Sequence, residues 1–194
     1  MHPFLLDDAS AALAERLRRV TVRLAGRGWN GAGSGVVWRH DGLIVTNAHV
    51  ARGAAMTVSL YDGRELTGRV AWRSRSMDLA ALQVDARDLL AAGTADAGSL
   101  RAGALVFAMG APLGMADALA TGVVHGAPTL DRAGRPLLVR ADIRLLPGNS
   151  GGPLADAAGR VIGINSMVVN GLGVAVATEA VEGWLRRHAQ ARAA

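Results

Sequence analysis

The sequence predicts an all-β fold of two six-stranded antiparallel β-barrels, with a short helix at each end of the chain. The 194 residues include 25 glycines, which weaken helix interiors but suit turns and bulges. Short β-prone runs recur along the chain, and Asp-Gly pairs at residues 41–42 and 62–63 stand between neighbouring runs, where they favour hairpin turns. Hydrophobic residues make up 51% of the chain and charged residues 19%, which is typical of a globular protein with a buried core.

The first half of the chain is predicted to form a helix and then the first barrel. Leu13 and Leu17 lie one helical turn apart within residues 8–19, and arginines stand at the C-terminal end, as in an amphipathic helix. The hydrophobic period then changes to that of strands. Six β-prone runs follow, at residues 20–24, 35–39, 43–47, 56–60, 65–72 and 79–84. We therefore assign residues 1–19 to an N-terminal helical segment and residues 20–88 to the first barrel, which carries His49 and Asp78.

The second half repeats this organisation after a connector at residues 89–103, a stretch rich in Ala, Asp and Gly. Six more β-prone runs predict a second barrel over residues 104–178, which carries Ser150. These runs are residues 105–109, 119–125, 137–141, 153–155, 161–167 and 173–177. Thr178 is predicted to cap a closing helix in the segment 179–194, from Glu179 to about residue 189.

Composition and charge argue against a nucleic-acid partner. Twenty-one arginines and no lysine against 16 acidic residues give a net charge of +5. The arginines are scattered, however, and one tyrosine and two phenylalanines are few for stacking on bases, so we expect a solvated basic surface and no nucleic-acid partner. The chain has no cysteine, so packing alone must hold the fold together.

The sequence shows no membrane or targeting segment. The N-terminus lacks the order of a signal peptide, because Asp7 and Asp8 interrupt it early. The least charged long stretch, residues 102–116, is too short to span a bilayer as a helix. As it stands, the chain is expected in the cytoplasm. If a leader has been trimmed from it, we expect it in the periplasm or outside the cell.

The segment Gly148-Asn149-Ser150-Gly151-Gly152 is the strongest functional signal. A nucleophile for acyl transfer needs a hydroxyl on a tight, exposed turn, with backbone N–H groups directed at the developing oxyanion. Glycines on both sides allow such a turn and let a substrate backbone approach closely. We predict Ser150 as the nucleophile and Gly148, Asn149 and Ser150 as the oxyanion hole, with the Gly148 and Ser150 amides as its donors. The alternative for this segment alone is a glycine-rich turn with an incidental serine.

Two further motifs supply a base and its partner, which a serine hydroxyl needs. His49 stands at the end of an apolar run, and Asp78 opens another, where its charge is costly to bury unless it is used. Orienting a histidine is such a use. Taken singly, His49 is also consistent with a structural histidine and Asp78 with a turn residue. The order His, Asp, Ser matches the two-barrel, chymotrypsin-like proteases and differs from subtilisins and α/β-hydrolases, so we predict a catalytic triad of His49, Asp78 and Ser150.

These motifs together resemble the trypsin-like protease domain of the HtrA/Deg family of serine proteases. The similarity extends from about residue 20 to the C-terminal helix. It rests on Gly33-Ser34-Gly35-Val36-Val37, residues 46–50, residues 78–82, Asp142, residues 147–153 and residues 161–166. The resemblance implies an ATP-independent bacterial serine endopeptidase in protein quality control or regulated proteolysis. It also implies unfolded or extended polypeptide substrates, a homo-oligomer that is a trimer, and neither a metal nor an organic cofactor.

The resemblance also indicates where substrate binds. Leu145 falls where the family lines its primary specificity pocket. Residues 166–169 are expected to pair with the substrate backbone as an added strand, so Ser166, Met167 and Val168 are candidate substrate-binding residues. Leu145, Val168 and Leu172 would make the specificity pocket apolar and fairly small.

The chain also departs from the family pattern. No PDZ domain follows the protease domain, the loops at residues 166–173 and 129–136 are shorter, and Gly110-Ala111-Pro112 replaces the usual Gly-Asn-Pro. We therefore expect an oxyanion hole that needs no separate activating peptide. The rival hypothesis is a catalytically silent peptide-binding or scaffold protein on the same fold. The complete triad argues against that rival, since a purely binding protein does not need Ser150.

Overall fold

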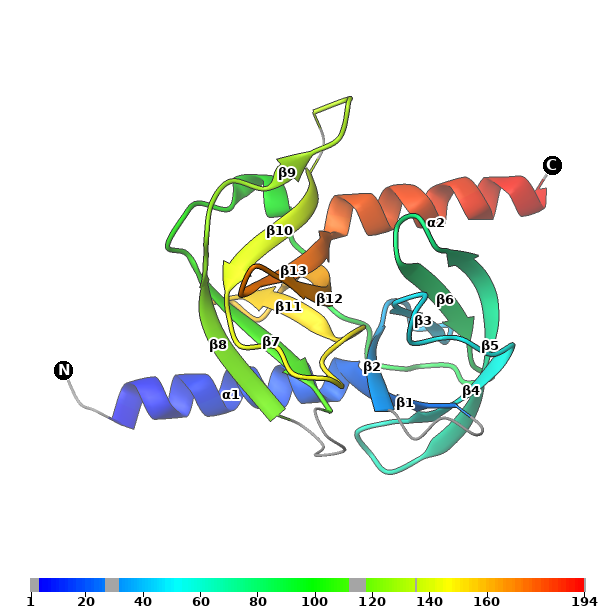
Figure 1. The fold of residues 1–194 in the computed structure, drawn as a ribbon. Helices are drawn as coiled ribbons and strands as arrows, with labels where there is room; N and C mark the ends of the chain where they lie inside the picture. Colours follow the sequence, from blue (N-terminus) through cyan, green and yellow to red (C-terminus); the bar gives the residue numbers. More distant parts are fainter. Residues whose placement is uncertain (1–3, 27–31, 112–117, 135, 194) are drawn as a thin grey trace.

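The protein folds into two β-barrels that lie side by side, with a helix at each end of the chain (Figure 1). The computed structural model describes residues 4–26, 32–111, 118–134 and 136–193. The predicted fold class, two antiparallel barrels with terminal helices, is confirmed.

Six antiparallel strands close the first barrel in the order β1-β2-β3-β6-β5-β4, and each corresponds to one predicted run. Strand β2 contains glycines because its neighbours fill the space beside it. A Cβ atom at Gly33 would lie 2.4 Å from Val50 Cγ1, and one at Gly35 would lie 2.9 Å from Ile44 Cγ2. The strands are β1 (Thr21–Ala25), β2 (Ala32–Val37), β3 (Leu43–Thr46), β4 (Ala55–Ser59), β5 (Glu65–Ser74) and β6 (Leu79–Gln83).

The second half forms a seven-stranded sheet in the order β13-β12-β11-β7-β8-β10-β9, and a further pairing of β13 with β10 closes six of these strands into a barrel. The sequence did not predict the seventh strand, β9 (Thr129–Leu130), which pairs with β10 inside the stretch expected to be a short loop. The other strands are β7 (Leu105–Gly110), β8 (Ala118–Val124), β10 (Pro136–Asp142), β11 (Pro153–Asp156), β12 (Val161–Val169) and β13 (Leu172–Ala177).

The connector between the barrels contains a short 3-10 helix, η1 (Ala97–Ser99), which the sequence did not predict. Asp96 caps it, because its carboxylate accepts a hydrogen bond of 2.7 Å from the Gly98 N–H. The Gly98 N–H also donates to the Glu179 carboxylate at 3.0 Å, which ties the connector to the start of the C-terminal helix.

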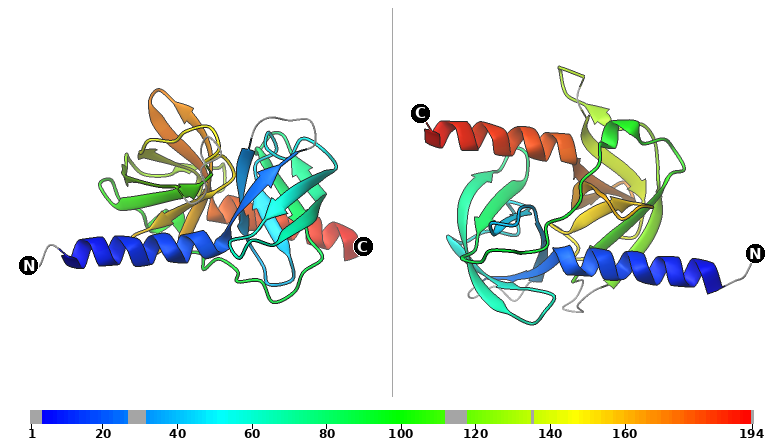
Figure 2. Two further views of the ribbon diagram at one scale, coloured as in Figure 1. Left: turned by 90° about the horizontal axis from the view of Figure 1, so that it is seen from below. Right: turned by 180° about the vertical axis from the view of Figure 1, so that it is seen from behind.

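Each terminal helix packs against the barrel to which it is not directly joined, as the three views in Figures 1 and 2 show. Helix α1 (Phe4–Val20) leads into the first barrel, yet Leu13 and Leu17 are buried against residues of the second. Helix α2 (Thr178–Ala193) follows the second barrel, yet Trp184 is buried with Leu43 and Val45 of the first. Trp38 of the first barrel also donates its indole N–H to Glu182 of α2 at 2.7 Å. The two helices therefore hold the barrels together from opposite ends of the chain.

Both helices are longer than predicted, and one predicted cap is wrong. Helix α1 begins at Phe4 and not near residue 8, and α2 extends to Ala193. Thr178 is the first residue of α2, and its hydroxyl donates a hydrogen bond of 3.1 Å to the carbonyl of Val161, so it is not the predicted helix cap. Within the described residues, neither helix is long and apolar enough to cross a membrane.

We expect Trp184→Ala to lower the free energy of unfolding by about 3–5 kcal/mol, because it removes a large side chain that is 2% exposed and leaves a cavity between α2 and the first barrel. Urea unfolding followed by circular dichroism measures this loss. Gln190→Ala, at an exposed position of the same helix, should change the stability by less than about 0.5 kcal/mol. Equal effects of the two substitutions would contradict the packing described for α2.

Candidate active site

His49 and Asp78 lie at the adjacent ends of two paired strands. Strand β3 ends at Thr46, and β6 begins at Leu79 directly after Asp78. The two strands pair with Thr46 opposite Ala80, so the turn that carries His49 lies beside Asp78. The His49 Nδ1 atom is 2.8 Å from Asp78 Oδ2 and 3.0 Å from Oδ1. The backbone N–H of His49 also donates to Oδ1 at 3.1 Å, so both the ring and the backbone of this residue hold the carboxylate.

The surroundings of Asp78 favour its charged form. Burial is the largest single influence and by itself raises the pKa. The hydrogen bonds from His49 and from the Ser166 hydroxyl, at 2.6 Å, together with the charge interaction with His49, outweigh it, so the pKa of Asp78 lies below its ordinary value. Asp78 also has a φ of 50°, a left-handed conformation that is uncommon outside glycine. Asn47 supports this turn by donating its side-chain N–H to the Asp78 carbonyl at 3.0 Å.

The lowered pKa of Asp78 makes part of the stability depend on pH. Because the folded-state pKa is below the unfolded value of about 3.9, this contribution is fully present above that value and is lost as the pH falls through the folded-state pKa. We therefore expect the stability difference between the wild type and Asp78→Asn to shrink as the pH falls below about 4. Urea unfolding of both proteins between about pH 2 and pH 6 measures it. A difference that grows as the pH falls would contradict this assignment.

Ser150 comes from the second barrel, in the loop between β10 and β11. Its hydroxyl donates a hydrogen bond of 3.1 Å to the carbonyl of Ser166, whose own hydroxyl binds Asp78. Within the described residues, no hydrogen bond joins Ser150 to the His49 ring. Such hydrogen bonds are often long or misaligned when no substrate is bound. Ser166 thus connects Ser150, the predicted nucleophile, with Asp78, the predicted partner of the base His49. The sequence did not reveal this role of Ser166.

The turn before Ser150 has the features of a type II turn, with Pro147 second and Gly148 third. The Asn149 N–H donates to the Leu146 carbonyl at 3.0 Å, and Gly148 has a φ of 108°, which favours glycine. The Asn149 carbonyl accepts in turn from Gly152 at 3.0 Å. Over the described ranges, neither the Gly148 nor the Ser150 N–H has a hydrogen-bond acceptor in the protein. Both predicted oxyanion-hole donors therefore remain without a partner among the described residues.

The two glycines after Ser150 are required by close packing, against the first barrel at Gly151 and against strand β7 of the second barrel at Gly152. Gly151 has a φ of 85°, and a Cβ atom there would lie 2.1 Å from the Ser34 carbonyl oxygen of the first barrel. A Cβ atom at Gly152 would lie 2.2 Å from the Met109 carbonyl oxygen. Any other residue at these two positions would push the Ser150 loop away from its neighbours.

The predicted substrate-binding residues are brought to one corner of the second barrel. In the β12–β13 hairpin, Val168 pairs with Gly173 and Val169 with Leu172. Leu145 approaches this pair from the other side, with its Cδ1 atom 3.0 Å from the position of a Cβ at Gly173. The largest cavity described, about 710 Å³, lies elsewhere on the first barrel, around His40, Asp85 and Arg87, and contains none of the candidate residues.

The end of strand β12 offers an open edge beside Ser150. Strand β12 pairs with β11 as far as Ile164, and Asn165 still exchanges backbone hydrogen bonds with Gly151 and Gly152. From Met167 to Val169 the strand pairs with β13. Ser166 is buried just before this stretch, whereas Met167 and Val168 are each 51% exposed. The backbone after Ser166 is therefore accessible for pairing with an extended peptide.

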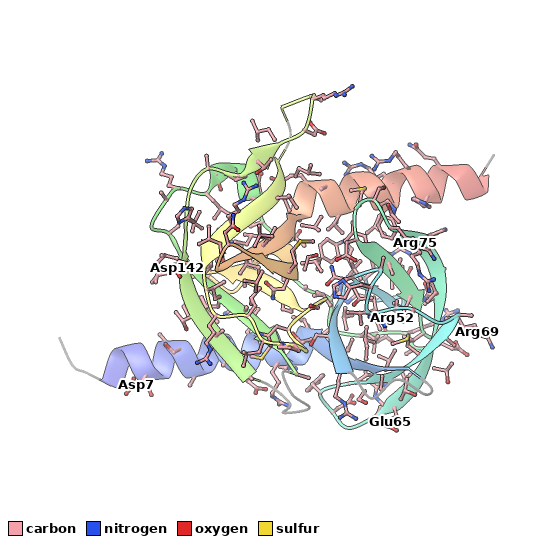
Figure 3. The ribbon with its side chains drawn as sticks, in the orientation of Figure 1. Asp7, Arg52, Glu65, Arg69, Arg75 and Asp142 are labelled. Atoms are coloured by element: carbon pink, nitrogen blue, oxygen red, sulfur yellow. The ribbon has the colours of Figure 1, made fainter. Side chains whose placement is uncertain are left out.

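Arg52 supports the turn that carries His49. Figure 3 draws the side chains of both barrels, with Arg52 labelled on the first barrel and Asp142 on the second. Arg52 donates its Nε–H to the His49 carbonyl at 2.9 Å and so steadies the turn that carries the histidine. In the part of the chain that the structure describes, no three His, Cys, Asp or Glu residues are placed to hold a metal ion.

The chain is similar to known trypsin-like peptidases in sequence and in fold. A family model described as a trypsin-like peptidase domain matches residues 33–164. A probable periplasmic serine endoprotease DegP-like from Halomonas elongata is 41% identical over 138 residues, or 70% of this chain and 29% of the relative. A serine protease Do-like HtrA from Bacillus subtilis is 36% identical over 174 residues, or 79% of this chain and 38% of the relative. The chain therefore spans only about a third of the length of these relatives.

A solved structure has the same fold. The HtrA-type protease AlgW with decapeptide superimposes with a TM-score of 0.81 over 93% of this chain and 67% of the other, at 24% sequence identity. The strand and barrel arrangement described above is therefore that of a known protease.

Proposed function

The chain belongs to the trypsin-like peptidase family, and from this premise we propose that it is a serine endopeptidase of the HtrA type, with His49, Asp78 and Ser150 as its catalytic triad. The observation that carries the proposal is the hydrogen-bonded series from Ser150 through Ser166 to Asp78 and His49. It gathers a hydroxyl, a carboxylate and an imidazole from both barrels at one place.

The proposed reaction is acyl transfer to water. The Ser150 oxygen attacks a peptide carbonyl while His49 accepts the hydroxyl proton, and Asp78 stabilises the resulting imidazolium. The Gly148 and Ser150 amides donate to the oxyanion of the tetrahedral intermediate. His49 then protonates the leaving amine, and an acyl-enzyme remains on Ser150. Water, deprotonated by His49, hydrolyses that ester and restores the serine.

Labelling with a fluorescent organophosphonate tests the nucleophile. Because the reagent reacts with an activated serine, the wild type should bind about one equivalent and Ser150→Ala none. Ser59→Ala, which removes a serine hydroxyl of the first barrel that bonds to Glu65, is the matched control and should label like the wild type. A wild type that binds peptides but is never labelled would favour the silent scaffold protein.

We further infer that the substrates are extended or unfolded polypeptide segments, as in protein quality control. The open edge of β12 supports this, because a folded domain rarely offers a strand able to pair with it. One relative is named a serine endoprotease and another a serine protease, which supports polypeptide substrates in general. A trimer of this chain stays a prediction, which light scattering of the purified protein would test.

Cleavage is expected after small or medium apolar residues such as Val, Ala or Leu, and not after Arg or Lys. The candidate pocket residues Leu145, Val168 and Leu172 are aliphatic, so no carboxylate among them would pair with a basic side chain. Sequencing the products of casein digestion measures the preference. A dominant cut after basic residues would show that these three residues do not line the pocket.

A further inference from the structure

We propose that Ser34, on strand β2 of the first barrel, is a positioning residue that holds the oxyanion hole of the second barrel in shape. The proposal rests on the function proposed above and adds a residue outside the triad. Ser34 is fully buried and lies 116 positions before Ser150 in the sequence, and it contacts the loop that carries the nucleophile through its side chain and its backbone.

Three hydrogen bonds fix Ser34 against the nucleophile loop and its surroundings. Its hydroxyl donates to the Gly148 carbonyl at 2.8 Å and accepts from the Ala111 N–H at 3.1 Å. Its backbone N–H donates to the Ser150 carbonyl at 2.9 Å. The hydroxyl thus uses its proton and one lone pair in a site without water access, and its orientation is determined by these partners.

These contacts act on the peptide units next to the two oxyanion-hole donors. The Gly148 carbonyl belongs to the peptide unit that follows the Gly148 N–H, and the Ser150 carbonyl to the unit that follows the Ser150 N–H. Because Ser34 donates a hydrogen bond to each of these two carbonyls, it limits rotation about the backbone dihedral angles of Gly148 and Ser150. Gly148 has the least hindered backbone of the turn, so it gains most from an external anchor. Ser34 therefore restricts the one residue whose freedom would let the hole lose its shape.

The anchor also makes the oxyanion hole depend on contact between the barrels. Ser34 belongs to β2 of the first barrel, whereas Gly148, Ser150 and Ala111 belong to the second. The Ser34 carbonyl oxygen packs against Gly151 and accepts a hydrogen bond of 2.6 Å from the Thr46 hydroxyl. Thr46 belongs to the first barrel, so this barrel also holds Ser34 in place. The hole is complete only when the two barrels are packed together.

The substitution Ser34→Ala tests the proposal, because it removes one oxygen and adds no bulk. We expect kcat for a peptide substrate to fall about 10- to 100-fold, somewhat less than when an oxyanion donor itself is lost, with KM changed by less than about twofold. The affinity for a peptide aldehyde should fall by a similar factor, because Ser150 adds to it and places an oxyanion in the hole. The affinity for the matching product peptide should stay unchanged.

Thr178→Val is the matched control. It removes a buried hydroxyl whose one partner among the described residues is the Val161 carbonyl, so it should lower stability to a similar extent and leave kcat within about twofold of the wild type. A Ser34→Ala enzyme with wild-type kcat and aldehyde affinity would overturn the proposal. So would a rise in KM at unchanged kcat, which would indicate a substrate-binding role instead.

Two further comparisons keep the outcome interpretable. If Ser34→Ala does not fold, Ser34→Cys carries the test, since the thiol is a weaker donor. A loss of kcat of about threefold or more at unchanged KM then supports the anchor, and wild-type kcat overturns it. Wild type and Ser150→Ala are assayed first, because a wild type without Ser150-dependent hydrolysis would refute the proposed function itself and not the role of Ser34.

Discussion

Replacing Ser150 with alanine should lower kcat for peptide hydrolysis by about 10⁴- to 10⁶-fold while leaving the fold and the thermal stability nearly unchanged. Among the described residues the hydroxyl makes one hydrogen bond, to the Ser166 carbonyl, and Ser150 is only partly buried, so its removal disturbs little packing. His49→Ala should cost about as much, because nucleophile and base act as one unit. The double variant should therefore be no slower than either single one.

Rates measured on a casein or peptide substrate, with melting temperatures from calorimetry, decide this prediction. Ser59→Ala serves as the control again and should keep wild-type kinetics. Turnover by Ser150→Ala within tenfold of the wild type would show that another group is the nucleophile. A double variant far slower than either single variant would show that Ser150 and His49 act independently.

Local sequence patterns predicted most of the fold because its strands are short, regular and joined by tight turns. Gly42 and Gly63, in the two Asp-Gly pairs, have φ values of 90° and 86°, as the predicted hairpin turns require. Strand β9 could not be predicted in this way, since two residues carry no hydrophobic period. The predicted helix starts near residue 8, whereas α1 starts at Phe4, which places Asp7 in the first turn, where a negative charge stabilises a helix.

In the candidate site, too, residues in local motifs were predictable and long-range contacts were not. His49, Asp78 and Ser150 stand in motifs whose meaning is local, and the sequence could therefore single them out. Ser34 and Ser166 could not be assigned their contacts, because these depend on how distant strands pack: Ser34 reaches Gly148 across 114 positions and Ser166 reaches Asp78 across 88. The only sequence signal for Ser34 is its place between two glycines.

Asp78→Asn should lower kcat by about 10⁴-fold without disrupting the fold. In the wild type both carboxylate oxygens lie within 3.0 Å of the His49 Nδ1 atom, which holds the ring with its proton on Nδ1 and the basic lone pair on Nε2. An asparagine side chain has one NH2 group, which donates, and one carbonyl oxygen, which accepts, in place of the two accepting oxygens of the carboxylate. When its amide N–H faces Nδ1, the ring moves its proton to Nε2 and can no longer accept the proton of Ser150.

Comparing the fall in kcat of Asp78→Asn with that of Ser166→Ala should show how much of the effect comes from the charge of Asp78 and how much from the hydrogen bond that positions it. Ser166→Ala removes the 2.6 Å bond to Oδ2 but keeps the carboxylate and both contacts with His49, so we expect a fall in kcat of only about three- to tenfold. Steady-state kinetics of the two variants near neutral pH, with KM measured alongside, make the comparison. Losses of equal size would mean that the position of the carboxylate matters more than its charge. A loss below tenfold for Asp78→Asn would mean that His49 keeps the correct tautomer without Asp78, which would remove the carboxylate from the triad.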